Sequence, residues 1–227
     1  MLFLIMDGSA RERRNPARNE VGMEMERRSG SKREENRQRN REAIKAAAWT
    51  VFATKGLDAS TVRDIVAASG VSIGTFYNYY GTREAVFHEI LDDLADQIRS
   101  LSGEARAHES EIEPMLAQSY RGFLEFILGL DGALDFCALN QHHIRSRLFT
   151  LTSTGGLLSD IERDMVRVMP AATLSASERT QAACLIVANA LEVLLQSRNG
   201  QPLDIDDTSR FITRLIVRGI GSWDRQD

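Results

Sequence analysis

Cysteine is scarce in this sequence. Its 227 residues include two cysteines, Cys137 and Cys184. Two thiols cannot form a disulfide framework or a cysteine-based zinc cluster, so a reducing compartment, the cytoplasm, is the simpler expectation. We interpret both side chains as buried small hydrophobic groups, with a redox sensor as the less favoured alternative.

Long apolar runs are also missing. No segment approaches the roughly 20 apolar residues that span a bilayer, so we expect no transmembrane helix and no membrane partner. Met1–Met6 is apolar, but it is short and followed by charge, unlike a secretory signal. Residues 7–33 are rich in Arg, Glu, Asn, Gly and Ser and lack apolar periodicity. This composition predicts a disordered N-terminal extension over residues 1–33.

Positive charge is not in excess, since the net charge is -4. That number alone argues against a nucleic-acid partner, but the charge is unevenly spread. Residues 27–83 contain eleven basic and five acidic residues, a net charge of +6, whereas residues 101–227 carry -5. A basic N-terminal segment on an acidic body is typical of a small DNA-contacting domain. A solvated, charged tail without a partner is the alternative.

Strand-like alternation is absent from residues 36–98, and the patterning is helical. A helix is expected over residues 36–55, where apolar side chains repeat at helical spacing: Ile44, Ala47, Ala48, Val51 and Phe52. A glycine after Lys55 would end this helix. Thr61 would cap a second helix and Thr82 a long fourth one.

The second and third helices form a helix-turn-helix pattern, joined at Ser69-Gly70-Val71-Ser72. The third helix, residues 73–80, would lie in the major groove, which is about 12 Å wide. Its four aromatic residues cannot all face inward on so short a helix. We expect a small core of Ile65, Val71, Phe76 and Tyr80. That arrangement leaves these residues facing outward: Ser72, Ile73, Gly74, Thr75, Tyr77, Asn78 and Tyr79.

These residues carry a family resemblance. Residues 44–91, and above all TVRDIVAASGVSIGTFYNYYGTREAVF at 61–87, resemble the DNA-binding domain of the TetR/AcrR transcriptional regulators. The match covers about a quarter of the chain. The resemblance implies an all-α fold, with a helix-turn-helix DNA-binding domain over residues 36–98 and an effector-binding and dimerisation domain over residues 99–227.

The resemblance also implies roles for individual residues. Thr61 and Arg63, at the start of the second helix, would contact phosphate. Ser72, Gly74 and Thr75 would lie at the entrance of the groove, where hydroxyl groups and an exposed backbone suit phosphate and base-edge contacts.

Further roles concern the third helix and the residue after it. Tyr77 and Tyr79 would bond phosphates, and Asn78 is the favoured base reader. Arg83 stands where the family usually has lysine and would hold a phosphate. Ile73 departs from the many members that carry lysine there, which favours an apolar contact such as a thymine methyl group.

The remainder of the chain is also patterned as helices. We expect them near residues 113–130, 133–148, 156–169, 176–196 and 208–221. The helix at 176–196 is apolar nearly all round, and the last helix carries an apolar stripe. Pairing with the same two helices of a second chain would hide that surface in a twofold interface, as the resemblance also implies. A homodimer presents two reading helices and hence needs a roughly palindromic operator.

Large apolar side chains on these helices are candidates for a ligand cavity: Tyr120, Phe123, Phe126, Phe136, Phe149, Met165 and Met169. The alternative is that they are ordinary core. No strongly charged pocket candidate stands out, so a small apolar or amphipathic effector is favoured. His142-His143 suggests a metal site, but adjacent helical residues point about 100° apart, so we expect the pair not to chelate together.

Signatures of catalysis are missing. The sequence has no nucleophile elbow, no phosphate-cradling glycine loop and no paired Glu-x-x-His motifs. We therefore expect no enzyme activity, no cofactor and no metal. The favoured function is a ligand-responsive repressor, released from a palindromic double-stranded DNA operator when a small-molecule effector binds. An activator of the same fold and an all-helical enzyme are the alternatives.

Overall fold

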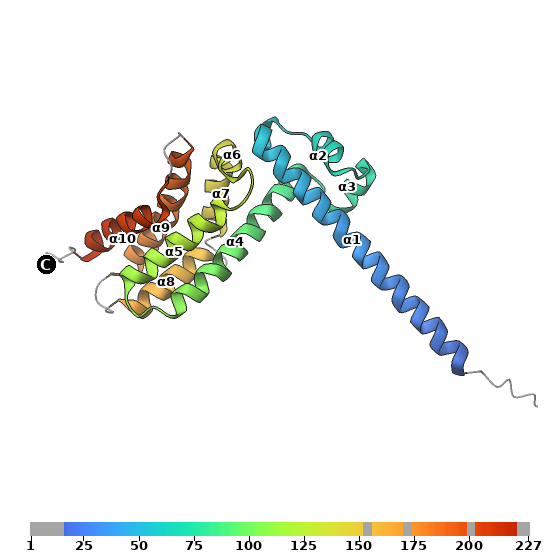
Figure 1. Ribbon diagram of the computed structural model, residues 1–227, viewed down its shortest axis with the longest axis horizontal. Coiled ribbons are helices and arrows are strands. Elements are labelled where there is room, and N and C mark those ends of the chain that lie inside the picture. Colours follow the sequence, from blue (N-terminus) through green and yellow to red (C-terminus); the bar gives the residue numbers. More distant parts are fainter. Residues whose placement is uncertain (1–15, 152–155, 170–173, 199–202, 222–227) are drawn as a thin grey trace, which may run out of the picture. The chain divides into compact units, whose positions relative to one another are not determined.

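The structure is a computed structural model that describes residues 16–151, 156–169, 174–198 and 203–221. All regular secondary structure in these ranges is α-helical. The helices are α1 Pro16–Ala59, α2 Val62–Ser69, α3 Ile73–Tyr79, α4 Arg83–Ala107, α5 Ile112–Leu128, α6 Ala133–Leu139, α7 Gln141–Leu151, α8 Leu157–Val168, α9 Ala176–Ser197 and α10 Ile205–Gly221 (Figure 1). The expected all-α fold is confirmed.

The chain divides into two compact units, residues 1–42 and residues 43–227. In the first unit, α1 begins at Pro16, so the predicted disorder is wrong for residues 16–33. Arg, Glu, Met and Ala have high helix propensity, and a helix needs no apolar face to make its own hydrogen bonds. Side-chain pairs add support, such as the 2.8 Å hydrogen bond from Gln38 Nε2 to Glu42 Oε1. Residues 1–15 lie outside the described ranges.

In the second unit, α1 buries the apolar face that the sequence predicts, with Ile44, Ala48 and Phe52 fully inaccessible. The helix is interrupted at Gly56, whose φ of +74° is unfavourable for residues with a Cβ. A Cβ at this position would also lie 3.4 Å from the carbonyl oxygen of Leu139. The predicted glycine break after Lys55 is therefore present, and close packing against α6 requires it.

The core around α1 extends from α2, α3 and α4 to helices much later in the chain. Phe87 of α4 stacks on Phe136 of α6, with ring centroids 5.6 Å apart. Trp49 of α1 stacks on the same Phe136 at 4.3 Å. Ile144 of α7 and Leu191 of α9 complete this cluster. Residues from α1 to α4 therefore share one core with α6, α7 and α9.

The remaining helices form a bundle in which α5 packs against both α4 and α10, and α9 packs against α8 and α6 (Figure 1). Two boundaries differ from the prediction. The helix expected over 133–148 is two helices, because Asn140 leaves the helical conformation between α6 and α7. The long helix α4 continues to Ala107, across the domain boundary expected at residue 98.

By length and composition, α9 qualifies as a membrane-spanning helix, although 28% of the tested window is buried in the structure. A core helix of a water-soluble protein has the same composition, and α9 packs against α5, α6 and α8. The helix therefore does not indicate a membrane protein.

Candidate nucleic-acid interface and effector cavity

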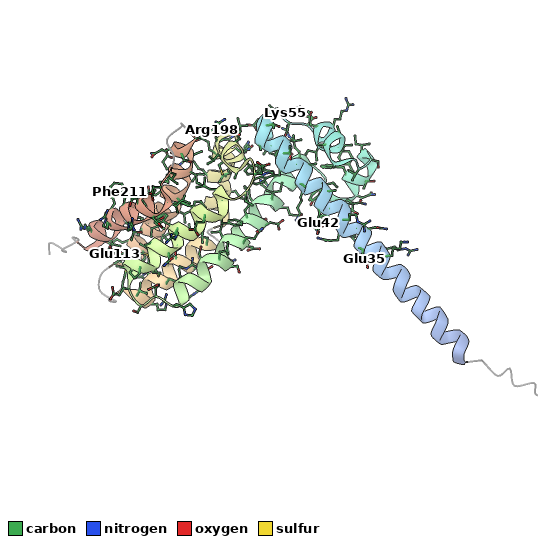
Figure 2. All side chains as sticks on the ribbon, viewed as in Figure 1. Glu35, Glu42, Lys55, Glu113, Arg198 and Phe211 are labelled. Atoms are coloured by element: carbon green, nitrogen blue, oxygen red, sulfur yellow. The ribbon has the colours of Figure 1, made fainter. Side chains whose placement is uncertain are left out.

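The second helix of the motif begins with a capping box. Thr61 Oγ1 accepts a hydrogen bond from Asp64 N at 3.2 Å, and Asp64 Oδ2 accepts one from Thr61 N at 2.8 Å. Lys55, near the end of α1 (Figure 2), donates to Asp64 Oδ1 at 2.6 Å. Hydrogen bonds from Lys55 and Thr61 lower the pKa of Asp64 to about 2. These interactions fix the angle at which α2 leaves α1.

The turn between α2 and α3 is equally well defined. Gly70 adopts a φ of +71°, and its N–H bonds to the carbonyl oxygen of Val66 at 3.2 Å, which ends α2. Ser72 then caps α3, because its Oγ accepts from Thr75 N at 3.0 Å. The hydroxyl groups of Ser72 and Thr75 also bond each other at 2.8 Å. The predicted caps and turn are confirmed.

The inward residues of the motif match the prediction. Ile65, Phe76 and Tyr80 are buried, and Val71 packs against them. Aromatic residues on α3 therefore divide between core and surface as its short length requires.

The outward face of α3 is left to five residues. Ser72, Ile73, Gly74, Tyr77 and Asn78 are exposed, with Ile73 at 48% and Tyr77 at 55% of their free surface. Large apolar and aromatic groups are unusual at such exposure on a short helix unless they contact a partner. The structure thus places the predicted base-reading and phosphate-contacting residues together on one accessible helix.

The other predicted DNA contacts have different surroundings. Thr75 and Tyr79 are half-buried, and Tyr79 packs against the core. Thr61 is exposed but uses its hydroxyl in the capping box, whereas Arg63 is exposed on α2.

Arg83 has protein partners for much of its guanidinium group. It donates to the carbonyl oxygens of Ser60 and Asp58 and forms an ion pair with Glu84 at 2.8 Å. The hydrogen bond from Arg83 lowers the pKa of Glu84. Arg83 therefore holds the segment before α2 in place, a role that its position in the sequence did not reveal.

A cavity of about 360 Å³ lies inside the bundle, between α4, α5, α6, α7, α8 and α9. Most of its wall is aliphatic, with Leu94, Ile98, Leu116, Ile161, Val187 and Leu194 among the lining residues. Its volume falls within the roughly 300–1,000 Å³ typical of ligand pockets. Tyr120 lines the cavity and donates its hydroxyl hydrogen to the carbonyl oxygen of Ile186 at 2.9 Å. Burial raises the pKa of Tyr120, so this hydroxyl stays protonated.

The cavity gathers three of the seven predicted ligand residues: Tyr120, Phe123 and Phe136. Phe126 packs instead in a separate cluster around Leu124 and Leu194. Met165 and Met169 lie one and two turns beyond Ile161 on α8, in the core beside the cavity rather than on its wall. The side chain of Phe149 lies outside the described residues.

The sequence analysis missed a charged region that adjoins the cavity. An open depression beside it is lined by four arginines, Arg99, Arg106, Arg163 and Arg167, and three aspartates, Asp96, Asp160 and Asp164. Arg99, Arg106 and Asp96 also line the cavity itself. The signal was present as paired i, i+4 charges on α8, but the sequence alone does not bring them to α4.

The aspartates neutralise part of this charge. Arg106 Nε bonds Asp164 Oδ2 at 2.5 Å, and Arg99 Nε bonds Asp160 Oδ2 at 2.8 Å. Burial raises the pKa of Asp160, but hydrogen bonds from Arg99 and Arg163 outweigh it and lower the pKa overall. The depression keeps one arginine more than it has aspartates, so an anionic group fits it better than a cationic one.

Capped α2 and α3, with a tight turn and an exposed second helix, define a helix-turn-helix DNA-binding domain. Residues 44–90 match the family profile described as bacterial regulatory proteins, tetR family. The chain belongs to the TetR family of transcriptional regulators.

Among curated proteins, the chain is 35% identical over 77 residues to the HTH-type transcriptional repressor KstR2 of Rhodococcus jostii, covering 32% of this chain. The aligned segment spans 38% of the length of that relative. The transcriptional regulator FadR of Bacillus subtilis, in complex with stearoyl-CoA, superposes with a TM-score of 0.66 at 19% identity, covering 78% of this chain and 98% of the other. The fatty acid degradation regulator FadR of Bacillus halodurans superposes at 0.61 and 18%, covering 81% and 96%. These two structures share the fold.

Proposed function

We propose that the chain is a cytoplasmic transcriptional repressor that binds a palindromic operator and leaves it when an amphipathic effector enters the bundle. The observation that carries this proposal is the cavity of about 360 Å³, which shares its α4 wall with the core of the DNA-binding helices. Leu91 of α4 lines the cavity and also belongs to the cluster around Phe52 and Phe76. A ligand that displaces α4 would therefore move the reading helices.

A homodimer through α9 and α10 is part of the proposal. Leu185 on α9 and Phe211 and Leu215 on α10 are each at least 60% exposed, and Phe211 is labelled on α10 in Figure 2. Three large apolar side chains at such exposure favour a covered interface. A twofold axis through these helices would present two copies of α3 to successive major grooves.

The lining of the bundle favours an effector with an apolar chain and an anionic head. The aliphatic cavity suits the chain, and the adjoining arginine-rich depression suits the head. The stearoyl-CoA in the Bacillus subtilis neighbour has this chemistry and supports an acyl thioester as the first compound to test. The named repressor among the relatives supports repression rather than activation.

DNA binding is tested with the full-length protein and the DNA upstream of its own gene. Fluorescence anisotropy over a salt titration should show binding to one fragment that is tighter than to random DNA. The variant that combines Tyr77→Phe and Asn78→Ala should lose most of this preference. Equal binding to all fragments, unchanged by the double variant, overturns the proposal. Transcription in vitro from the bound promoter distinguishes repression from activation.

Effector release is tested by adding stearoyl-CoA, free stearate or coenzyme A to the preformed complex. Release by the first compound alone supports an effector that needs both chain and head. An Arg163→Gln variant should need more ligand for release, because it removes one exposed arginine of the depression. Arg214→Gln, on α10 outside the depression, is the matched control. Release that is equal for all three proteins argues against a role for the depression.

A further inference from the structure

Three side chains that commonly bind metals meet where the end of α1 lies beside the start of α7. The carboxylate of Asp58 is 2.9 Å from His143 Nε2 and 3.2 Å from His142 Nε2. One donor atom from each residue lies within 4.8 Å of the other two. The two imidazole rings are 3.8 Å apart between centroids. The expectation that adjacent histidines point apart is wrong here, because rotation about the side-chain bonds turns both rings toward Asp58.

We propose that Asp58, His142 and His143 form a binding site for a divalent transition-metal ion, with zinc as the first candidate. Imidazole nitrogen and carboxylate oxygen are ligands that suit zinc, nickel and copper. Donors bound to one ion at about 2.0–2.2 Å lie roughly 3 to 3.5 Å from each other in tetrahedral geometry. The distances between Asp58 and the two histidines already match that spacing, so binding needs little rearrangement.

The exposure of the site suits an ion that exchanges with solvent. Asp58 is 69% and His142 60% exposed at the side chain, which leaves room for water to complete the coordination. His143 is 30% exposed, and its ring lies edge-on to Phe87 with centroids 5.9 Å apart. The hydrogen bond from His143 lowers the pKa of Asp58, which keeps the carboxylate ionised.

The backbone on both sides of the site is anchored. Leu57, directly before Asp58, donates its N–H to Asn140 Oδ1 at 2.6 Å. Asn140 precedes the two histidines by two and three residues. The carbonyl oxygen of Asp58 accepts a hydrogen bond from Arg83 at 3.2 Å. The three ligands are therefore presented from positions that other interactions already fix, which lowers the entropic cost of binding.

A bound ion would tie the segment that leads into α2 directly to α7. Asp58 lies three residues before Thr61, the cap of α2. His142 and His143 are in the first turn of α7, which contributes Ile144 to the cavity wall. The ion would therefore stabilise the contact between the DNA-binding helices and the bundle.

The test is zinc titration calorimetry on the full-length protein in chelator-treated buffer. We expect one zinc ion per chain. Asp58→Asn, His142→Ala and His143→Ala should each weaken binding by more than the roughly 10–100-fold that changes outside the ligand shell produce. The chain has four histidines, so His88→Ala and His108→Ala, both at exposed positions, are matched controls and should bind zinc as the unmodified protein does.

A second measurement follows the thermal unfolding midpoint. Zinc at about 100 times its dissociation constant should raise the midpoint by ~5–10 °C in the unmodified protein and the two controls. The three ligand variants should show little or no increase, while their midpoints in chelator confirm that they fold. Zinc binding that survives in these variants overturns the proposal, as does the absence of zinc, nickel and copper binding to the unmodified protein. Neither measurement involves DNA, so its outcome is independent of the proposed repressor function.

Discussion

The side-chain oxygen of Asn140 accepts a hydrogen bond from the backbone N–H of Leu57 at 2.6 Å, across 83 residues of sequence. The amide nitrogen of Asn140 donates to the carbonyl oxygens of Phe52, at 3.0 Å, and Phe136, at 2.8 Å. Asn140 is fully buried. One side chain therefore satisfies three backbone groups, at the break in α1 and at the end of α6, and joins the DNA-binding helices to the bundle.

Replacing Asn140 should be costly. Asn140→Ala leaves the N–H of Leu57 buried without its acceptor and removes two donors from carbonyl oxygens. We expect a loss of ~2–4 kcal/mol in the free energy of unfolding, since each unpaired buried group costs about 1–3 kcal/mol. Urea denaturation followed by circular dichroism measures the loss. The exposed Gln118→Ala on α5 is the control and should stay within about 0.5 kcal/mol of the unmodified protein.

Acid should weaken the capping box of α2. The pKa of Asp64 is lowered from 3.8 to about 2, so the folded state favours the ionised carboxylate. The resulting stabilisation is complete above pH 3.8 and is lost as the pH falls through 2. Asp64→Asn should therefore be less stable than the unmodified protein at neutral pH, with a difference that shrinks between these two values. Thermal unfolding at a series of pH values gives the difference, and a gap that does not depend on pH contradicts the assignment.

A cation at position 73 should add a phosphate contact. Ile73 is exposed on α3, so Ile73→Lys should fold normally. The slope of the logarithm of the operator affinity against the logarithm of salt concentration should steepen by about 0.9 for each phosphate gained. Leu139→Lys on α6 adds the same charge away from α3 and should leave the slope unchanged. Identical slopes for the two variants would count against α3 as the DNA-contacting helix.

Filling the cavity should separate DNA binding from effector response. Ala190 of α9 lines the cavity, and Ala190→Phe would place a ring in it. We expect operator affinity within about threefold of the unmodified protein, a stability change within the ~1–3 kcal/mol typical of overpacking, and loss of release by ligand. Anisotropy with and without stearoyl-CoA measures both properties. A variant that still releases DNA at the same ligand concentration shows that the effector binds elsewhere.

A charge on the outer face of α10 should disrupt the dimer. Leu215 is 62% exposed in the single chain, so Leu215→Asp removes apolar surface without disturbing the core. Sedimentation velocity should show a monomer, and operator affinity should fall more than tenfold because one reading helix binds without its twofold mate. Leu101→Asp on α4, also exposed, should remain dimeric and bind DNA normally. A dimeric Leu215→Asp protein would place the interface on other helices.

Local signals predicted the DNA-binding helices well. Thr61, Gly70 and Ser72 act through hydrogen bonds to residues no more than four positions away, so their roles can be read from spacing. The division of α3 between buried Phe76 and exposed Tyr77 follows from helical geometry in the same way. The resemblance to the TetR/AcrR regulators rests on the same short segment, which explains why it was visible before the structure.

Effects that depend on distant partners were not predictable. A helix over 133–148 satisfied every local rule, and the break at Asn140 exists because Phe52 and Leu57 bind its side chain. Arg83 was expected to hold a phosphate, but the carbonyl oxygens of Ser60 and Asp58 already occupy part of its guanidinium group.

The sequence by itself determined the helical class, the caps of α2 and α3, and the residues that face outward from the reading helix. These features depend on backbone hydrogen bonding and periodicity, which act within a few residues. Tertiary structure decided which aromatic side chains enclose the cavity, how four arginines adjoin it, and that His142 and His143 meet Asp58. Those arrangements depend on how helices rotate and pack against one another, and packing couples residues that the sequence separates by many turns.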